Sequence, residues 1–240
     1  MASNPEWLQA ELANRGLTRR DLLRYCGGLA VAWSLPIGMA PKIAEAMERA
    51  RKPVLVWLEF QDCAGNTESL LRASRPNVAS VILDAISLDY HETIMAAAGS
   101  RAEEALQKSI EEADGAFLAV VEGSIPEAED GIYCTIGGRT ALQIAQDHCS
   151  RAAAVIAVGT CASFGGLPAA KPNPTSALSV EEAVPGLETL INMPACPVNV
   201  ENLTALLVYH LAFGRWPQLD HLRRPLFAYG KTIHDNCERR

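Results

Sequence analysis

Residues 152–166, AAAVIAVGTCASFGG, decide the fold. The first seven of them are apolar without interruption, which is typical of a strand that is buried on both faces of a parallel sheet. The glycine and threonine that follow end the strand, and Cys161 stands directly beyond them. The stretch therefore predicts a strand over 152–158 with a cysteine at its carboxyl end.

The same pattern extends to both sides of this strand. Short apolar runs alternate with stretches in which apolar residues recur at helical spacing. The pattern predicts strands over 54–60, 78–88, 116–121, 152–158 and 189–193, helices over 67–73, 103–113, 140–150 and 200–213, and a loop over 170–181. Such alternation indicates an α/β fold, with a doubly wound parallel sheet that carries helices on both faces.

The composition limits the classes of function. The chain has 240 residues, of which 49% are hydrophobic, so it can bury one sizeable core and a small appendage. Its formal charge is -7, and its acidic and basic residues are interspersed, so no basic stripe exists for a nucleic acid. Its seven cysteines have neither the paired spacing of a zinc ribbon nor the density of a disulfide scaffold. We therefore expect metal or cluster ligation and no nucleic-acid partner.

Three cysteines each follow a predicted strand. Cys63 follows the first strand, Cys161 the fourth and Cys196 the fifth. Ligands of open α/β sheets gather beyond the carboxyl ends of the strands, and thiolates suit iron-sulfur clusters. A single cysteine of this kind is more often a small buried apolar residue. Three at successive strand ends favour a common cluster site.

The N-terminal segment resembles a twin-arginine export signal. Residues 17–24 read LTRRDLLR, and the apolar run 25–40 that follows is shorter than the roughly 20 residues of a spanning helix. Ala44-Glu45-Ala46 has the small-x-small pattern of a cleavage site, so the signal is predicted over 1–46 with cleavage after Ala46. The chain would then be periplasmic. The alternative is an amphipathic N-terminal helix with an accidental arginine pair.

Several motifs together are similar to the small subunit of nickel-iron hydrogenases. They lie in order over nearly all of the chain after the signal. They are VWL at 56–58, LDYHETIMAAAG at 88–99, VEG at 121–123, GTCA at 159–162, FGG at 164–166, PNPT at 172–175, CP at 196–197, RPLF at 224–227 and IHDNC at 233–237. The match indicates an uptake-type, twin-arginine exported member of that family.

The resemblance implies a function and a ligand set. Cys63, Cys161 and Cys196 would hold the proximal iron-sulfur cluster, and His234 and Cys237 would begin the ligand set of a distal 4Fe-4S cluster that is only partly encoded here. The partner would be the large subunit, where H2 is oxidised at a nickel-iron centre. Electrons would pass through this chain to an acceptor, such as a membrane cytochrome b or another redox partner, so the chain would be membrane-associated.

Two departures from the family pattern affect the clusters. The first departure is at position 66. Most members have a second cysteine three residues after the one that corresponds to Cys63, where this chain has Asn66. The proximal cluster could then be a 3Fe-4S form, a 4Fe-4S form with an oxygen or other ligand, or a 4Fe-4S form that uses a spare cysteine such as Cys134. Gly65 and Gly166 stand where oxygen-tolerant members have extra cysteines.

The second departure is at the C-terminus. In the family a cysteine-rich domain follows the distal histidine, whereas this sequence stops at Arg240. We therefore expect a flavodoxin-like proximal-cluster domain over 47–215 and the start of a truncated C-terminal iron-sulfur domain over 216–240.

Two other functions remain open from the sequence. The loop 64–68 is similar to the phosphate-binding loop of flavodoxins, because backbone amides and the Thr67 hydroxyl at a helix N-terminus suit an anion. A flavodoxin-like FMN-binding electron carrier is thus the main alternative. A structural paralogue without a working chain of clusters is the other. Asp62 and Glu122 flank the cluster loops. Each could be a solvated or helix-capping residue, and each could equally take part in proton relay or in tuning the cluster.

Overall fold

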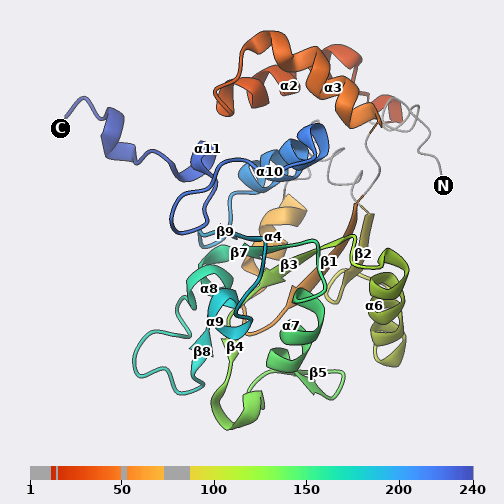
Figure 1. Cartoon of the computed structure of the whole chain (residues 1–240), viewed down its shortest axis with the longest axis vertical. Helices are drawn as coiled ribbons and strands as arrows, with labels where there is room; N and C mark the ends of the chain where they lie inside the picture. The colour runs from red at the N-terminus through yellow and green to blue at the C-terminus, as the bar shows by residue number, and fades with distance from the viewer. Residues whose placement is uncertain (1–11, 15, 50–52, 73–86, 240) are drawn as a thin grey trace. The chain divides into compact units, whose positions relative to one another are not determined.

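The structure is a computed structural model that describes residues 12–14, 16–49, 53–72 and 87–239 (Figure 1). It divides into two compact units. One comprises Pro53–Leu71 and Ile86–Asn199, and the other comprises Met1–Lys52, Arg72–Ala85 and Val200–Arg240. We call them the sheet unit and the helical unit, and each is described by itself.

A parallel sheet forms the centre of the sheet unit. Its strands in the described residues are β1 (Val54–Glu59), β2 (Ser87–His91), β3 (Phe117–Glu122), β7 (Ala154–Val158) and β9 (Leu190–Met193). They lie in the order β2-β1-β3-β7-β9, and every neighbouring pair is parallel. This is the flavodoxin strand order. The predicted doubly wound α/β fold is therefore confirmed.

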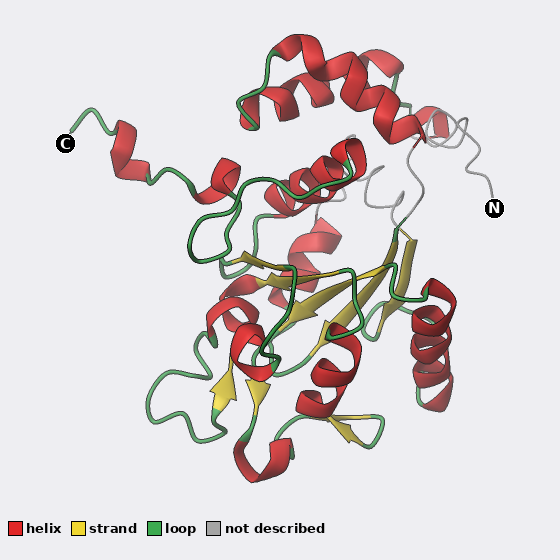
Figure 2. Ribbon diagram, in the orientation of Figure 1, coloured by secondary structure: helices red, strands yellow, loops and turns green. Residues whose placement is uncertain are grey.

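Helices cover both faces of this sheet, as Figure 2 shows. On one face α6 (Ser100–Ala113) and α7 (Ala141–Cys149) pack against alternate residues of β1 and β3, among them Val56 and Val121. The residues between these, which include Glu59 and Glu122, point to the opposite face, where α4 (Gly65–Arg72) begins. One face is thus apolar, and the other carries carboxylates at its carboxyl edge.

Most predicted elements lie where the sequence placed them. Of the predicted strand 78–88, residues 78–86 lie outside the described part of the chain, and the described strand β2 continues to His91, beyond the predicted end. The predicted loop 170–181 is partly wrong, because it contains β8 (Ala177–Leu178), which pairs with β4 (Ile125–Pro126), and the start of α9 (Val180–Ala183). A capping box of Ser179 and Glu182 starts α9, a signal that the loop-like composition concealed. The remaining short elements are η2 (Ala128–Gly131), β5 (Thr135–Ile136), β6 (Arg139–Thr140) and α8 (Gly159–Phe164).

The helical unit has an apolar core of its own. Its elements are α2 (Arg19–Ala32), η1 (Ile37–Met39), α3 (Ala40–Arg49), α10 (Val200–Phe213), α11 (Leu226–Tyr229) and η3 (Ile233–Asn236). Cys26 of α2 and Ile43 of α3 are buried in one cluster with Val208 of α10. The described residues of the predicted export signal therefore form helices packed on α10. None of the helices in the described residues is long and apolar enough to cross a membrane.

Candidate functional site

The three predicted cluster cysteines come together at the carboxyl edge of the sheet. Cys63 lies between β1 and α4, Cys161 lies in α8 directly after β7, and Cys196 follows β9. The amide of Thr160 donates to the carbonyl of Ala195 over 2.9 Å, which joins the second and third loops. Burial raises the pKa of the Cys161 thiol, and the charges of Cys196 and Cys63 raise it further. The loop of Cys63 also contacts the loop of Cys196, through the hydrogen bond from the Val198 amide to Asn66 Oδ1, so all three cysteine loops meet at this edge.

Two glycines pack closely against these thiols. A Cβ atom on Gly166 would lie 2.6 Å from Sγ of Cys161, and one on Gly65 would lie 3.1 Å from Sγ of Cys63 and 3.9 Å from Cβ of Pro197. Larger side chains at these positions would fill the room around the sulfur atoms. Free thiols against which glycine backbone packs so closely fit the requirements of an iron-sulfur cluster, whose sulfides need close approach by the backbone.

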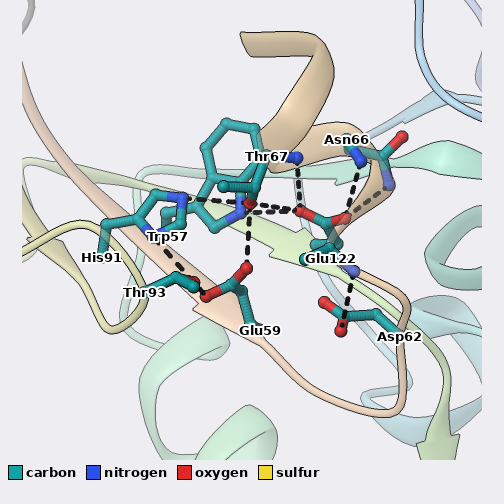
Figure 3. A network of polar contacts seen from close by, with 9 residues as sticks. Trp57, Glu59, Asp62, Asn66, Thr67, His91, Thr93 and Glu122 are labelled. Carbon is teal, nitrogen blue, oxygen red and sulfur yellow. Dashed lines mark hydrogen bonds and ion pairs between the residues drawn. The ribbon is translucent and has the colours of Figure 1, made fainter. Parts of the chain in front are cut away.

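Glu122, the last residue of the central strand β3, ties the first cysteine loop to the sheet (Figure 3). Its side chain is fully buried. One oxygen accepts hydrogen bonds from the backbone and the side-chain amide of Asn66, at 2.8 and 3.0 Å. The other accepts from Trp57 Nε1 at 3.2 Å and from the backbone and hydroxyl of Thr67, at 3.0 and 2.8 Å. The carboxylate thus occupies the N-terminus of α4, as the capping interpretation expected.

A second buried carboxylate, Glu59, lies beside this contact. It interacts with the Thr67 hydroxyl at 2.9 Å and with the Thr93 hydroxyl, and its Oε2 lies 3.5 Å from Nδ1 of His91. The His91 ring stacks on Trp57 with a centroid distance of 5.2 Å. Burial raises the pKa of Glu59, and Glu122 raises it further, whereas burial lowers the pKa of His91 to about 4. These shifts favour the neutral forms of both groups.

The buried His91 predicts a loss of stability in acid. Its pKa falls from 6.5 to about 4 on folding, so between these values the unfolded chain binds the extra proton. We expect the free energy of unfolding to fall by up to about 3 kcal/mol as the pH is lowered through this window. The raised pKa of Glu59 acts in the opposite direction, so the contribution of His91 is measured as the difference between the wild type and His91→Gln in urea unfolding at several pH values. Equal pH slopes for the two proteins would contradict it.

The other residues considered as ligands belong to other elements than the three cysteine loops. His234 is exposed in η3, and Cys237 follows it, half-buried, in the helical unit. Cys134 packs against the core beneath α6 and α7, and Cys149 is buried in that core, as expected for a structural cysteine. Sequence reasoning missed Glu59, Trp57 and His91 as members of the site. The available signal was a carboxylate inside an apolar strand, since a buried charge needs partners.

Comparison with known proteins places this arrangement in a class of oxidoreductase subunits. The family model described as NADH ubiquinone oxidoreductase, 20 Kd subunit, matches residues 63–210, which span all three cysteine loops. The periplasmic NiFe hydrogenase small subunit 1 of Nitratidesulfovibrio vulgaris (strain Hildenborough) is 46% identical over 235 residues, which are 98% of this chain and 74% of that protein. The chain belongs to the family of nickel-iron hydrogenase small subunits.

Two further relatives agree with this assignment. The hydrogenase-2 small chain of Escherichia coli (strain K12) is 41% identical over 227 residues, covering 95% of this chain and 61% of that one. A solved structure of a reduced, active Ni-Fe-Se hydrogenase from Desulfomicrobium baculatum has a TM-score of 0.72 and 34% identity, over 78% of this chain and 74% of that chain. The predicted family is confirmed, and the chain spans between about three fifths and three quarters of these relatives.

Proposed function

We propose that this chain carries electrons for a nickel-iron hydrogenase, through an iron-sulfur cluster held by Cys63, Cys161 and Cys196. The observation that carries the proposal is that the three loops bearing these thiols follow strands of one sheet and are joined to one another by hydrogen bonds at its carboxyl edge. The electrons would come from H2 oxidation at the nickel-iron centre of a large subunit, and this chain would bind no nickel.

The bound cluster would supply one-electron transfer. The residues of this chain would position the cluster and exclude bulk solvent from its surroundings. Gly65 and Gly166 let the backbone approach the thiols closely, and Glu122 fixes the start of α4 so that the loop of Cys63 keeps its place. Rigid support of this kind keeps ligands in the geometry that the cluster needs.

The flavin alternative is not favoured. A flavodoxin-like loop would use the free amides at the start of α4 to bind a phosphate. Here the amides of Asn66 and Thr67 and the Thr67 hydroxyl all donate to Glu122. The chain therefore supplies its own anion at that helix N-terminus, which leaves these donors engaged before any phosphate arrives.

The finer parts of the function follow from the family resemblance. We propose that His234 and Cys237 begin the ligand set of a distal cluster, and that residues 1–46 direct twin-arginine export to the periplasm. The acceptor would be a membrane cytochrome b or another redox partner. Support for export comes from the arginine pair in α2, and the relative in Nitratidesulfovibrio vulgaris is named as periplasmic.

Cluster assembly tests the proposal. The chain, reconstituted under anaerobic conditions with iron and sulfide, is expected to bind a cluster, and Cys161→Ser is expected to lose at least about 90% of the bound iron because one ligand is removed. The measurements are iron and sulfide content with the visible absorption spectrum. Cys149→Ser, which changes a core cysteine outside the site, is the control and should keep its iron. A wild-type chain that binds FMN and no iron would contradict the proposal.

A further inference from the structure

Asn66, the residue at the position of the missing thiolate, is fully engaged in holding loops together. Its Oδ1 accepts a hydrogen bond from the backbone amide of Val198 at 2.8 Å. Its Nδ2 donates to Glu122 at 3.0 Å and contacts the carbonyl oxygen of Val158 at 3.5 Å. The side chain thus joins the beginning of α4, the ends of β3 and β7, and the loop that follows Cys196.

The surroundings of Asn66 keep its side chain in this position. Only 8% of the residue is exposed. Gly159 has a φ of +80°, and a Cβ atom there would lie 2.5 Å from Nδ2 and 2.8 Å from Oδ1 of Asn66. If the side chain turned away to bring Oδ1 to an iron atom, the Val198 amide would lose its acceptor and Nδ2 would leave Glu122, and a buried unpaired amide costs about 1–3 kcal/mol. These contacts favour a role for Asn66 as a brace between loops over a role as a ligand.

Two other residues of the sheet unit, Cys134 and Asp62, are candidates for the fourth ligand, and both have other contacts. Cys134 packs against the apolar core that α6 and α7 cover. Asp62 accepts a hydrogen bond from the amide of Ala64 at 3.3 Å. Its carboxylate also lies within 4.8 Å of those of Glu59 and Glu122, so it faces the carboxylate pair (Figure 3).

We propose that the cluster is held by the thiolates of Cys63, Cys161 and Cys196 alone, and that its fourth iron has a solvent-derived oxygen ligand that a small thiolate can displace. The inference depends on the proposed function, because it concerns the same cluster. One iron of the cluster would then have no protein ligand, where a 4Fe-4S cluster normally has four. An iron held only by sulfides and solvent is the first to leave on oxidation.

The test uses the 240-residue chain reconstituted with iron and sulfide under reducing, anaerobic conditions. Ferricyanide serves as the one-electron oxidant. The 4Fe-4S cluster in its 2+ state gives a 3Fe-4S cluster in its 1+ state, one Fe2+ ion and one electron, which reduces ferricyanide. We expect the wild type to release one iron in four to a ferrous chelator and to develop the electron paramagnetic resonance signal of an oxidised three-iron cluster.

Matched variants identify the ligand of the fourth iron. Asn66→Cys is expected to retain all of its iron under the same treatment, whereas Asp62→Ala and Cys134→Ser should release iron as the wild type does. If Asn66→Cys does not fold, the wild type alone decides, because benzenethiolate should change the paramagnetic resonance spectrum of its reduced cluster. If the wild type keeps all four irons and its paramagnetic resonance spectrum does not change with benzenethiolate, the inference is overturned while the proposed function stays intact. A chain that binds no iron would contradict the proposed function itself.

Discussion

Glu122→Ala is expected to unfold the cluster-free chain or to reduce its free energy of unfolding by more than about 4 kcal/mol. The substitution leaves without an acceptor the buried donors of Trp57, Asn66 and Thr67, which all bond to this carboxylate. Each buried donor that loses its partner costs about 1–3 kcal/mol, and water can reach only some of them. Urea unfolding followed by circular dichroism measures the change.

The control for this prediction is Glu127→Ala. Glu127 lies five residues further along the chain and is exposed, so its loss should alter the free energy of unfolding by less than about 0.5 kcal/mol. Glu122→Gln should fall between the two, because its amide oxygen still accepts whereas its NH2 group faces donors. If Glu122→Ala is as stable as Glu127→Ala, the hydrogen bonds to Glu122 do not hold the first cysteine loop.

Gly166→Ala is expected to reduce iron binding by a factor of about ten or more while the chain still folds. Gly166 has a φ of +60°, and a Cβ atom there would lie 2.6 Å from Sγ and 2.8 Å from Cα of Cys161. Since the second contact is with the backbone, rotation of the thiol alone cannot relieve the clash, and the backbone of Cys161 must shift from its position beside the other two loops. The measurement is iron content after reconstitution, together with circular dichroism to show that the fold is retained.

A second glycine separates the clash from backbone strain. Gly186 also has a positive φ, +86°, but a Cβ atom there would have no neighbour within 4 Å. Gly186→Ala should therefore lose about 1–2 kcal/mol of stability through the left-handed conformation alone and keep its full iron content. Equal iron loss in both variants would show that general destabilisation, and not the position of Cys161, explains the effect.

The sequence predicted the sheet because its strands are apolar enough to be recognised without tertiary information. The run at 154–158 is buried throughout, and the helix 200–213 was predicted at its observed bounds. The cysteine loops could also be placed, since each follows a strand end. The end of strand β2 at His91 was missed, and the strand predicted to stop at residue 88, because the sequence SLDYH is more polar than the residues before it.

The polar side of the site could not be predicted because it depends on which strands are neighbours. Glu59 and Glu122 are 63 residues apart in the chain and become adjacent only through the pairing of β1 and β3. The role of Asn66 likewise requires Val198, 132 residues further on. Hydrogen bonds between such distant residues leave no periodic signal in a single sequence, in contrast to helical and strand patterns.

Successive side chains of β3 point to opposite faces of the sheet, so the hydrogen bonds of Glu122 depend on the alignment of this strand with its neighbours. If β3 aligned with its neighbours one residue out of step, Val121 would take the place of Glu122 beside α4, and the carboxylate would enter the apolar layer under α6 and α7. That layer offers it none of the five donors, so a misaligned intermediate would contain a desolvated carboxylate without hydrogen bonds. The same residue that braces the cysteine loops therefore discriminates against incorrect strand pairing while the chain folds.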